Sequence, residues 1–344
     1  AITGTSLGIT STAGAVTLTN PANDVDTLSV ANDDREVSFN DKDGVRIDGI
    51  TGGPIMLSVG GDLTQTGAIT GTSLGITSTA GAVTLNNPAN DVDSLAVNNG
   101  SRAVSFTDND DVQIDGITGG AIKLAVGGDL TQTGAITGTS LGITSTAGAV
   151  TLTNANNDVD SLAVSNGSRA VSFTDIDTLS LAGVTGGAVT LNVGGDLTQT
   201  AAITASSLSV NASAGAVTLT NAANNVDTLS LANDGRAVSY TDKDGLQLDG
   251  ITGGSITLAV GGDLTQSGPI TGTSLGITST AGAVTLTNGE NDVDTLSVAN
   301  GNRAVSFTDQ DGVQLSGITG GAITLAVGGD LTQTGAITGT SLGI

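Results

Sequence analysis

The chain has 344 residues, 33 of them acidic and 9 basic, so its formal net charge of −24 argues against nucleic acid and anionic membranes as partners. It contains no cysteine and no histidine, which excludes disulfides and Cys/His zinc sites. No apolar run approaches the roughly 18 residues of a transmembrane helix, so we expect no membrane span.

A 67-residue repeat organises the whole chain. The phrase GGDLTQTGAITGTSLGITSTAGAVTL covers residues 60–85 and returns unchanged at residues 127–152. A fixed period of this size is typical of stacked supersecondary units, so we expect one continuous solenoid over residues 1–344. The chain begins and ends within the phrase AITGTSLGI, which indicates a window from a longer array. The repeats are 1–67, 68–134, 135–201, 202–268 and 269–335, with a partial sixth at 336–344.

The first repeat shows the expected elements in chain order. Short segments in which apolar residues alternate with small or polar ones are separated by turns rich in Gly, Asn and Asp. Alternation with period two predicts strands with one buried face, and the abundance of Gly, Ser, Thr and Asn disfavours helix. The expected strands lie at residues 7–9, 16–18, 28–30, 37–39, 45–47 and 55–59.

Short strands without helices could build a sandwich, a propeller or a solenoid. A propeller blade takes roughly 40–50 residues, and a 67-residue repeat is not a whole number of such blades. Three coils of about 22 residues do fit the period, and strands of such coils pair with the coils above and below. The sequence therefore predicts an all-β fold, a parallel β-helix with about three coils per repeat.

The aromatic residues recur once per repeat, at the same position each time. A chain so poor in large aromatic side chains must bury its apolar surface in a narrow interior. We expect each aromatic to fill a wide corner of that interior, and the alternative is a row on which a ligand stacks. The five aromatics are Phe39, Phe106, Phe173, Tyr240 and Phe307.

An Asp-x-Asp turn follows each aromatic. Paired carboxylates on a turn resemble the start of a calcium loop, because hard cations prefer oxygen ligands. The full EF-hand pattern and the GGxGxD repeat are both absent, so carboxylates that cap backbone N–H groups are the favoured interpretation. Calcium is the one cofactor considered, with candidate ligands Asp41, Asp43, Asp108, Asp110, Asp242, Asp244, Asp309 and Asp311.

A second polar turn carries Asn-Asp-Val-Asp, or Asn-Asn-Val-Asp in the fourth repeat, with another Asn three residues upstream. Asparagines at the same turn of successive repeats can form side-chain amide bonds to the backbone. We therefore expect a structural role for Asn20, Asn87, Asn154, Asn221 and Asn288 and for Asn23, Asn90, Asn157, Asn224 and Asn291.

Catalysis and ice binding are disfavoured. Parallel β-helices host polysaccharide-cleaving enzymes, but here every acid recurs in each repeat, and no His, Cys or Lys recurs beside it as a base or nucleophile. A flat ice-binding face needs a threonine at the same place in every coil, whereas the Val-Thr-Leu-Thr phrase returns only once per repeat. We expect a protein that is not an enzyme.

The phrases GGDLTQTGAIT, TAGAVTLTN, NDVDTL and RAVSFTD, arrayed head to tail, resemble the repeats of filamentous-haemagglutinin-like exoproteins and large repetitive adhesins of Gram-negative bacteria. The resemblance covers the whole chain. It implies a right-handed parallel β-helix, secreted by a partner transporter in two-partner secretion and displayed on the cell surface as a long extracellular fibre.

The sequence therefore predicts a non-catalytic structural shaft of an extracellular bacterial fibre or adhesin, with a role in surface attachment or a matrix. Expected partners are adjacent repeats or other copies of the chain, and a host or neighbouring-cell surface. Two alternatives stay open. One is a self-assembling filament or surface-layer component, because an uncapped solenoid offers unpaired strand edges. The other is a calcium-dependent binding module built on the Asp-x-Asp turns.

Overall fold

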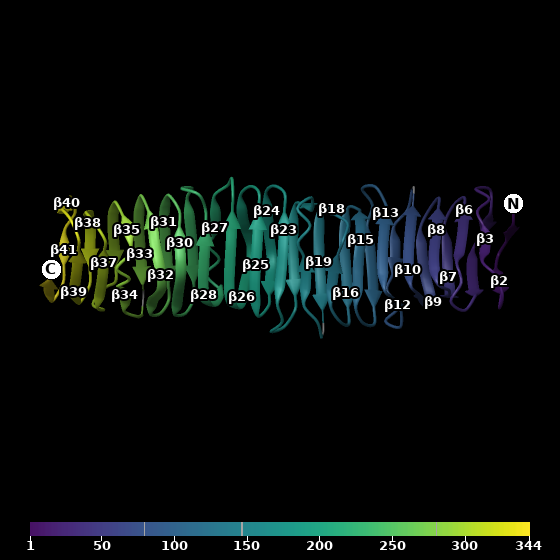
Figure 1. The fold of residues 1–344 in the computed structure, drawn as a ribbon, viewed down its shortest axis with the longest axis horizontal. Coiled ribbons are helices and arrows are strands. Elements are labelled where there is room, and N and C mark those ends of the chain that lie inside the picture. Colours follow the sequence, from purple (N-terminus) through teal and green to yellow (C-terminus); the bar gives the residue numbers. More distant parts are fainter. Residues whose placement is uncertain (79, 146, 280) are drawn as a thin grey trace. The chain divides into compact units, whose positions relative to one another are not determined.

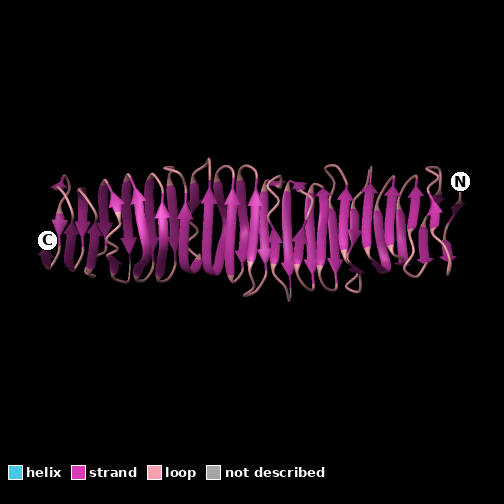
Figure 2. Ribbon diagram, viewed as in Figure 1, coloured by secondary structure: helices cyan, strands magenta, loops and turns pink. Residues whose placement is uncertain are grey.

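A computed structural model describes residues 1–78, 80–145, 147–279 and 281–344. Within these ranges the protein is built from strands and turns, with no helix (Figure 2). The residues between the ranges fall inside the repeats starting at 68, 135 and 269 and lie outside the described part. The chain forms two compact units, Ala1–Asp175 and Ile176–Ile344.

The strands of the first unit are mostly short. They are β1 Thr3–Gly4, β2 Leu7–Thr10, β3 Val16–Leu18, β4 Asp24–Val25, β5 Thr27–Ala31, β6 Val37–Asp41, β7 Val45–Thr51, β8 Pro54–Val59, β9 Leu63–Gly71, β10 Ser73–Ser78, β11 Val83–Leu85, β12 Asp91–Val92, β13 Ser94–Asn98, β14 Val104–Asp108, β15 Val112–Thr118, β16 Ala121–Val126, β17 Leu130–Gln132, β18 Ile136–Gly138, β19 Ser140–Ser145, β20 Val150–Leu152, β21 Asp158–Val159, β22 Ser161–Ser165 and β23 Val171–Asp175.

The second unit repeats the pattern, with one long strand, β26, in the fourth repeat. Its strands are β24 Leu179–Thr185, β25 Ala188–Val193, β26 Leu197–Ala212, β27 Val217–Leu219, β28 Asn225–Ala232, β29 Val238–Asp242, β30 Leu246–Thr252, β31 Ser255–Val260, β32 Leu264–Gly272, β33 Ser274–Ser279, β34 Val284–Leu286, β35 Asp292–Val293, β36 Thr295–Ala299, β37 Val305–Asp309, β38 Val313–Thr319, β39 Ala322–Val327, β40 Leu331–Gln333, β41 Ile337–Thr338 and β42 Ser341–Gly343.

The strands of the first unit form two stacks in which each strand pairs in parallel with the strand one turn before and after it (Figure 1). The first stack runs β2, β5, β7, β9, β11, β14, β16, β19, β22. The second stack runs β3, β6, β8, β10, β13, β15, β17, β20, β23. The expected parallel β-solenoid is therefore confirmed.

Each turn of the solenoid is shorter than the coil that the sequence predicts. Val83 pairs with Val104 one turn later, and Val104 pairs with Ile122 after one further turn. Moving from β2 to β19 takes seven turns of the first stack and two repeats of sequence. One repeat therefore occupies three and a half turns, and equivalent strands of successive repeats alternate between the two stacks.

The interior of the solenoid is filled by Val, Leu and Ile from alternate strand positions, as the period-two pattern predicts. The aromatics lie in this interior and are at most 2% exposed. Phe106 pairs with Leu85 of the turn before and Leu124 of the turn after. Phe39 lies between Leu18 and Leu57 in the same way. Such packing confirms the space-filling role and excludes a surface row of aromatics.

Two glycine positions are required by the geometry. Gly116 has a φ of +129° where the pairing of β13 with β15 shifts by one residue, a conformation that favours glycine. At Gly127 the turns lie so close together that a Cβ atom would overlap the backbone oxygen of Asn109. These glycines allow the chain to turn tightly while adjacent turns stay within hydrogen-bonding distance.

Candidate functional site

The first aspartate of each Asp-x-Asp turn is buried and bonded to the backbone. Asp108, at the end of β14, is 3% exposed. Its Oδ2 accepts the N–H of Val92 at 3.1 Å, and its Oδ1 accepts the N–H of Asp110 at 3.2 Å. The Val92 bond reaches the preceding turn, so the carboxylate links two turns. The equivalent bond to a preceding valine is made by Asp41, Asp175, Asp242 and Asp309.

Burial controls the electrostatics of these carboxylates. It raises the pKa of Asp108 to about 7, although the two backbone N–H donors oppose the shift. Burial also raises the pKa of Asp41, Asp242 and Asp309. In the fourth repeat the Tyr240 hydroxyl donates to Asp242 Oδ2 at 3.0 Å, and burial raises the pKa of this tyrosine as well.

The second aspartate of each turn is exposed, so the two carboxylates of a pair lie in different environments. In the first two repeats Asp41 and Asp108 are buried, whereas Asp43 and Asp110 are exposed. The same holds for Asp242 with Asp244 and for Asp309 with Asp311. Among the described residues no group of three or more acidic side chains is arranged to hold a metal ion. Calcium binding by these turns stays a prediction.

Asn90 is the most heavily bonded side chain of the second polar turn. Its Oδ1 accepts the N–H of Ile69 in the preceding turn at 2.9 Å. Its Nδ2 donates to the oxygen of Leu85 at 3.2 Å and to that of Thr107, in the following turn, at 2.9 Å. One buried amide thus holds three turns together. The matching bonds to the following turn are made by Asn23, Asn157, Asn224 and Asn291.

A glutamine that the sequence pattern did not single out completes this network. Gln65 Nε2 donates to Asn90 Oδ1 at 2.8 Å, while Gln65 Oε1 accepts from Asn90 Nδ2 at 3.0 Å. The signal was present, because this glutamine recurs with every copy of the phrase GGDLTQ. Its contact with Asn90 could not be read from the sequence, because that contact depends on which residues the coil brings together. Three further pairs join Gln132 to Asn157, Gln199 to Asn224 and Gln266 to Asn291.

A third set of asparagines lies in the turn before each aromatic strand. Asn99 is fully buried, and its Nδ2 donates to the oxygen of Ala103 at 2.9 Å. Its Oδ1 has no hydrogen-bond partner in the described structure. The same arrangement recurs at Asn32, Asn166, Asn233 and Asn300.

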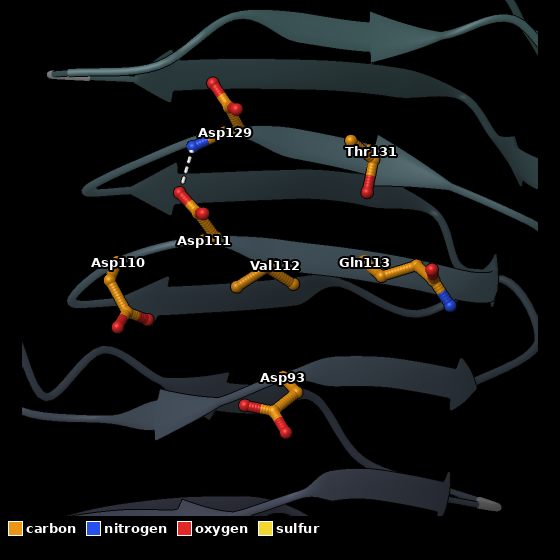
Figure 3. A pocket seen from close by; sticks show the side chains of 7 residues that line it. All are labelled: Asp93, Asp110, Asp111, Val112, Gln113, Asp129 and Thr131. Atoms are coloured by element: carbon orange, nitrogen blue, oxygen red, sulfur yellow. Dashed lines mark hydrogen bonds between the residues drawn. The ribbon is translucent and has the colours of Figure 1, made fainter.

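An acidic hollow opens on the surface of the second repeat (Figure 3). Asp93, Asp111 and Asp129 each precede a strand of the second stack, in three successive turns. Asp111 stands where other repeats have Gly or Thr, and its Oδ1 accepts the N–H of Asp129 at 2.6 Å. Asp110 also lines the hollow. Such a surface attracts cations by its charge.

Asn90, Asp108 and Gln65 and their equivalents in the other repeats share one role, because their hydrogen bonds run between successive turns. In an apolar interior such bonds fix the register of the turns, since an unpaired polar group there is costly.

The part of the chain that the structure describes has no helix long and apolar enough to cross a membrane.

Comparison with known proteins identifies the repeat. A family described as repeats of unknown function, DUF5649, matches residues 34–98, 101–166, 168–233 and 235–300, so the matches follow one another with the period of the repeat. No curated protein and no solved structure matches the chain. Because the matches cover well over half of the sequence, the chain belongs to the DUF5649 family of repeats.

Proposed function

We propose that this protein is a structural shaft, a non-catalytic part of an extracellular bacterial fibre or adhesin. The observation that carries the proposal is the use of the recurrent polar residues. Asp108, Asn90 and Gln65 and their equivalents form hydrogen bonds to neighbouring turns. A chain that repeats such links in each copy of its sequence holds each turn to its neighbours along its length, which is the property that a shaft requires.

The acidic surface supports the same proposal. With a net charge of −24 and an acidic hollow in the second repeat, neighbouring fibres repel each other at low salt. Divalent cations would reduce that repulsion and bring fibres together. In this proposal the shaft presents a binding tip to a host or neighbouring-cell surface, and its secretion and location follow the resemblance to filamentous-haemagglutinin-like exoproteins.

Immunogold electron microscopy of the producing cells tests the proposal. An antibody against one 67-residue repeat is expected to label thin filaments that leave the cell. Label in the cytoplasm would contradict an extracellular shaft. Label spread as a closed lattice over the envelope would instead support a surface-layer component, which is the self-assembling alternative.

A calcium-dependent binding module on the Asp-x-Asp turns is the second candidate; the acidic hollow lined by Asp93, Asp110, Asp111 and Asp129 supports it only through its charge, since the described acids form no group of three or more arranged to hold a metal ion. If calcium binds the folded protein there, the melting temperature rises with calcium and falls when a chelator is added. Replacing Asp111 by Gly, the residue of three other repeats, should abolish that rise. Equal melting temperatures with calcium and with chelator would rule out this candidate.

A further inference from the structure

The sequence contains four Asn-Gly pairs, and one of them differs from the other three in the solvent exposure of its asparagine. Asn99, Asn166 and Asn300 are at most 1% exposed, whereas Asn288 is half-buried and precedes two exposed residues. We propose that Asn288 is a modification site, at which the side-chain amide is lost by spontaneous deamidation with water as the co-reactant.

The reaction uses atoms of the chain itself. The backbone nitrogen of Gly289 forms a bond to Asn288 Cγ, and the Cγ–Nδ2 bond breaks. Nδ2 leaves as ammonia with the proton that Gly289 nitrogen gives up, and a cyclic imide remains. Water then adds to one of the two imide carbonyls and opens the ring, which yields aspartate or isoaspartate at position 288. No oxidant or reductant is involved.

The turn at Asn288 favours the first step. The Oδ1 of Asn288 accepts the N–H of Glu290 at 2.8 Å, which folds the side chain over the intervening glycine. This donor also stabilises the negative charge that develops on Oδ1 when Cγ is attacked. As at Gly100, Gly167 and Gly301, no described atom other than those of its chain neighbours lies within 4 Å of the position that a Gly289 Cβ would take, so the pairs differ at the asparagine and not at the glycine.

The other three pairs lack the accessible amide and the donor to Oδ1. Asn99 Nδ2, the leaving group, is held by the oxygen of Ala103 at 2.9 Å in a buried site. Its Oδ1 has no donor to stabilise a negative charge. Asn166 and Asn300 share the buried amide and the unpartnered Oδ1.

The repeats supply matched controls within the same chain. Asn20 and Asn87 occupy the equivalent turn and accept the same bond from the residue two positions on, but proline follows each of them. Proline has no N–H to lose, so the attack is blocked. At Asn154 and Asn221 the following residue is alanine, whose side chain hinders the attack. The residue after the asparagine therefore sets the difference in reactivity among these turns.

Deamidation would change the link between turns. Asn288 Nδ2 donates to the oxygen of Ser267 in the preceding turn at 3.3 Å. A carboxylate cannot donate this bond, and it adds a negative charge beside Glu290. We expect local loosening of the turn in the fifth repeat while the buried links of Asn291 persist.

The test is peptide mass spectrometry of the folded full-length protein during incubation at mildly alkaline pH, with fragmentation to separate Asn288 from Asn300. Because a buried hydrogen bond must break at the other Asn-Gly sites, Asn288 should convert at least about tenfold faster than Asn99, Asn166 or Asn300. The variant Gly289→Ala, which copies the turn of the third and fourth repeats, should suppress the conversion.

Three outcomes would overturn the proposal. Equal conversion at the buried Asn-Gly pairs would show that the turn geometry does not select the site. Conversion unchanged by Gly289→Ala would exclude attack by the glycine nitrogen. An intact Asn288, under conditions in which a free peptide of residues 284–294 deamidates, would show that the fold protects the turn.

Discussion

At the residue scale, the solenoid depends on a small set of buried amides and carboxylates that recur with the repeat. The sequence predicts a structural role for the asparagines and favours capping carboxylates over calcium ligands at the Asp-x-Asp turns. It could not show that Asn90 and Asp108 reach into adjacent turns, because that contact depends on which residues the coil brings together. Gln65 was missed for the same reason.

Replacing Asn90 by Ala should destabilise the protein strongly. The substitution leaves the N–H of Ile69 and the oxygens of Leu85 and Thr107 without their Asn90 partner in a buried site. Each such group costs about 1–3 kcal/mol, so we expect a loss of at least about 3 kcal/mol in the free energy of unfolding. Denaturant titration followed by circular dichroism measures the effect.

The matched control is Asn109→Ala, because Asn109 is exposed. This surface substitution should change the free energy of unfolding by no more than about 0.5 kcal/mol. Similar losses for the two variants would show that the Asn90 network contributes nothing special to stability.

The stability of the protein should fall as the pH rises from about 4 to 7. Because burial raises the pKa of Asp108 from 3.8 to about 7, the folded chain binds this proton more tightly than the unfolded chain across that window. The free energy of unfolding therefore decreases with rising pH through the window, and this contribution is flat above and below it. Denaturant titrations at a series of pH values measure the slope.

The variant Asp108→Asn removes this titration. It should be less stable than the parent, because Nδ2 cannot accept the N–H that one oxygen of Asp108 now accepts. Its slope between pH 4 and 7 should also be shallower, whereas Asp110→Asn, which removes a neighbouring charge that helps to raise the pKa of Asp108, should reduce the slope only in part. An Asp108→Asn variant with the parent's pH dependence would contradict the assignment.

At the element scale, the period and the alternation predicted the fold but not the length of its turn. Strands at residues 16–18, 37–39 and 45–47 were expected and fall within β3, β6 and β7. The expected coil length came from dividing the period by a whole number, three. The structure has shorter turns, as from Val83 to Val104 and from Val104 to Ile122. One repeat therefore makes three and a half turns and not three. Pairing register depends on long-range contacts and cannot be read from one repeat alone.

Because each repeat makes three and a half turns, equivalent residues of successive repeats should face opposite sides of the solenoid. Thr17 and Thr151 are exposed on β3 and β20 of the second stack, seven strands apart, while Thr84 is exposed on β11 of the first stack. Spin labels on the double variant Thr17→Cys/Thr151→Cys should lie about 34 Å apart on one face, from the strand spacing. The chain has no native cysteine, so labelling is specific.

Pulsed electron resonance measures these distances. The pair Thr17→Cys/Thr84→Cys should give a separation that includes the thickness of the solenoid, because its labels project from opposite faces. Separations of about 14 Å for this pair and about 29 Å for the first would instead indicate three whole turns per repeat.

At the scale of the whole molecule, the repeated links give the chain its proposed mechanical role. Each of the two units carries several copies of the same turn-to-turn network, as Asn90 and Asn157 show in the first and Asn224 and Asn291 in the second. In such an array each turn contacts its neighbours, so force is resisted turn by turn and not by one global core.

Single-molecule stretching of the full chain between its two ends tests this claim most directly. We expect a series of force steps, each releasing one or more turns, with roughly 60–75 Å of extended chain per turn. The Asn90→Ala variant should lower the force of the steps that open its own turns and leave the others unchanged. Smooth extension without steps, as in a disordered chain, would contradict the proposal of a shaft that resists force.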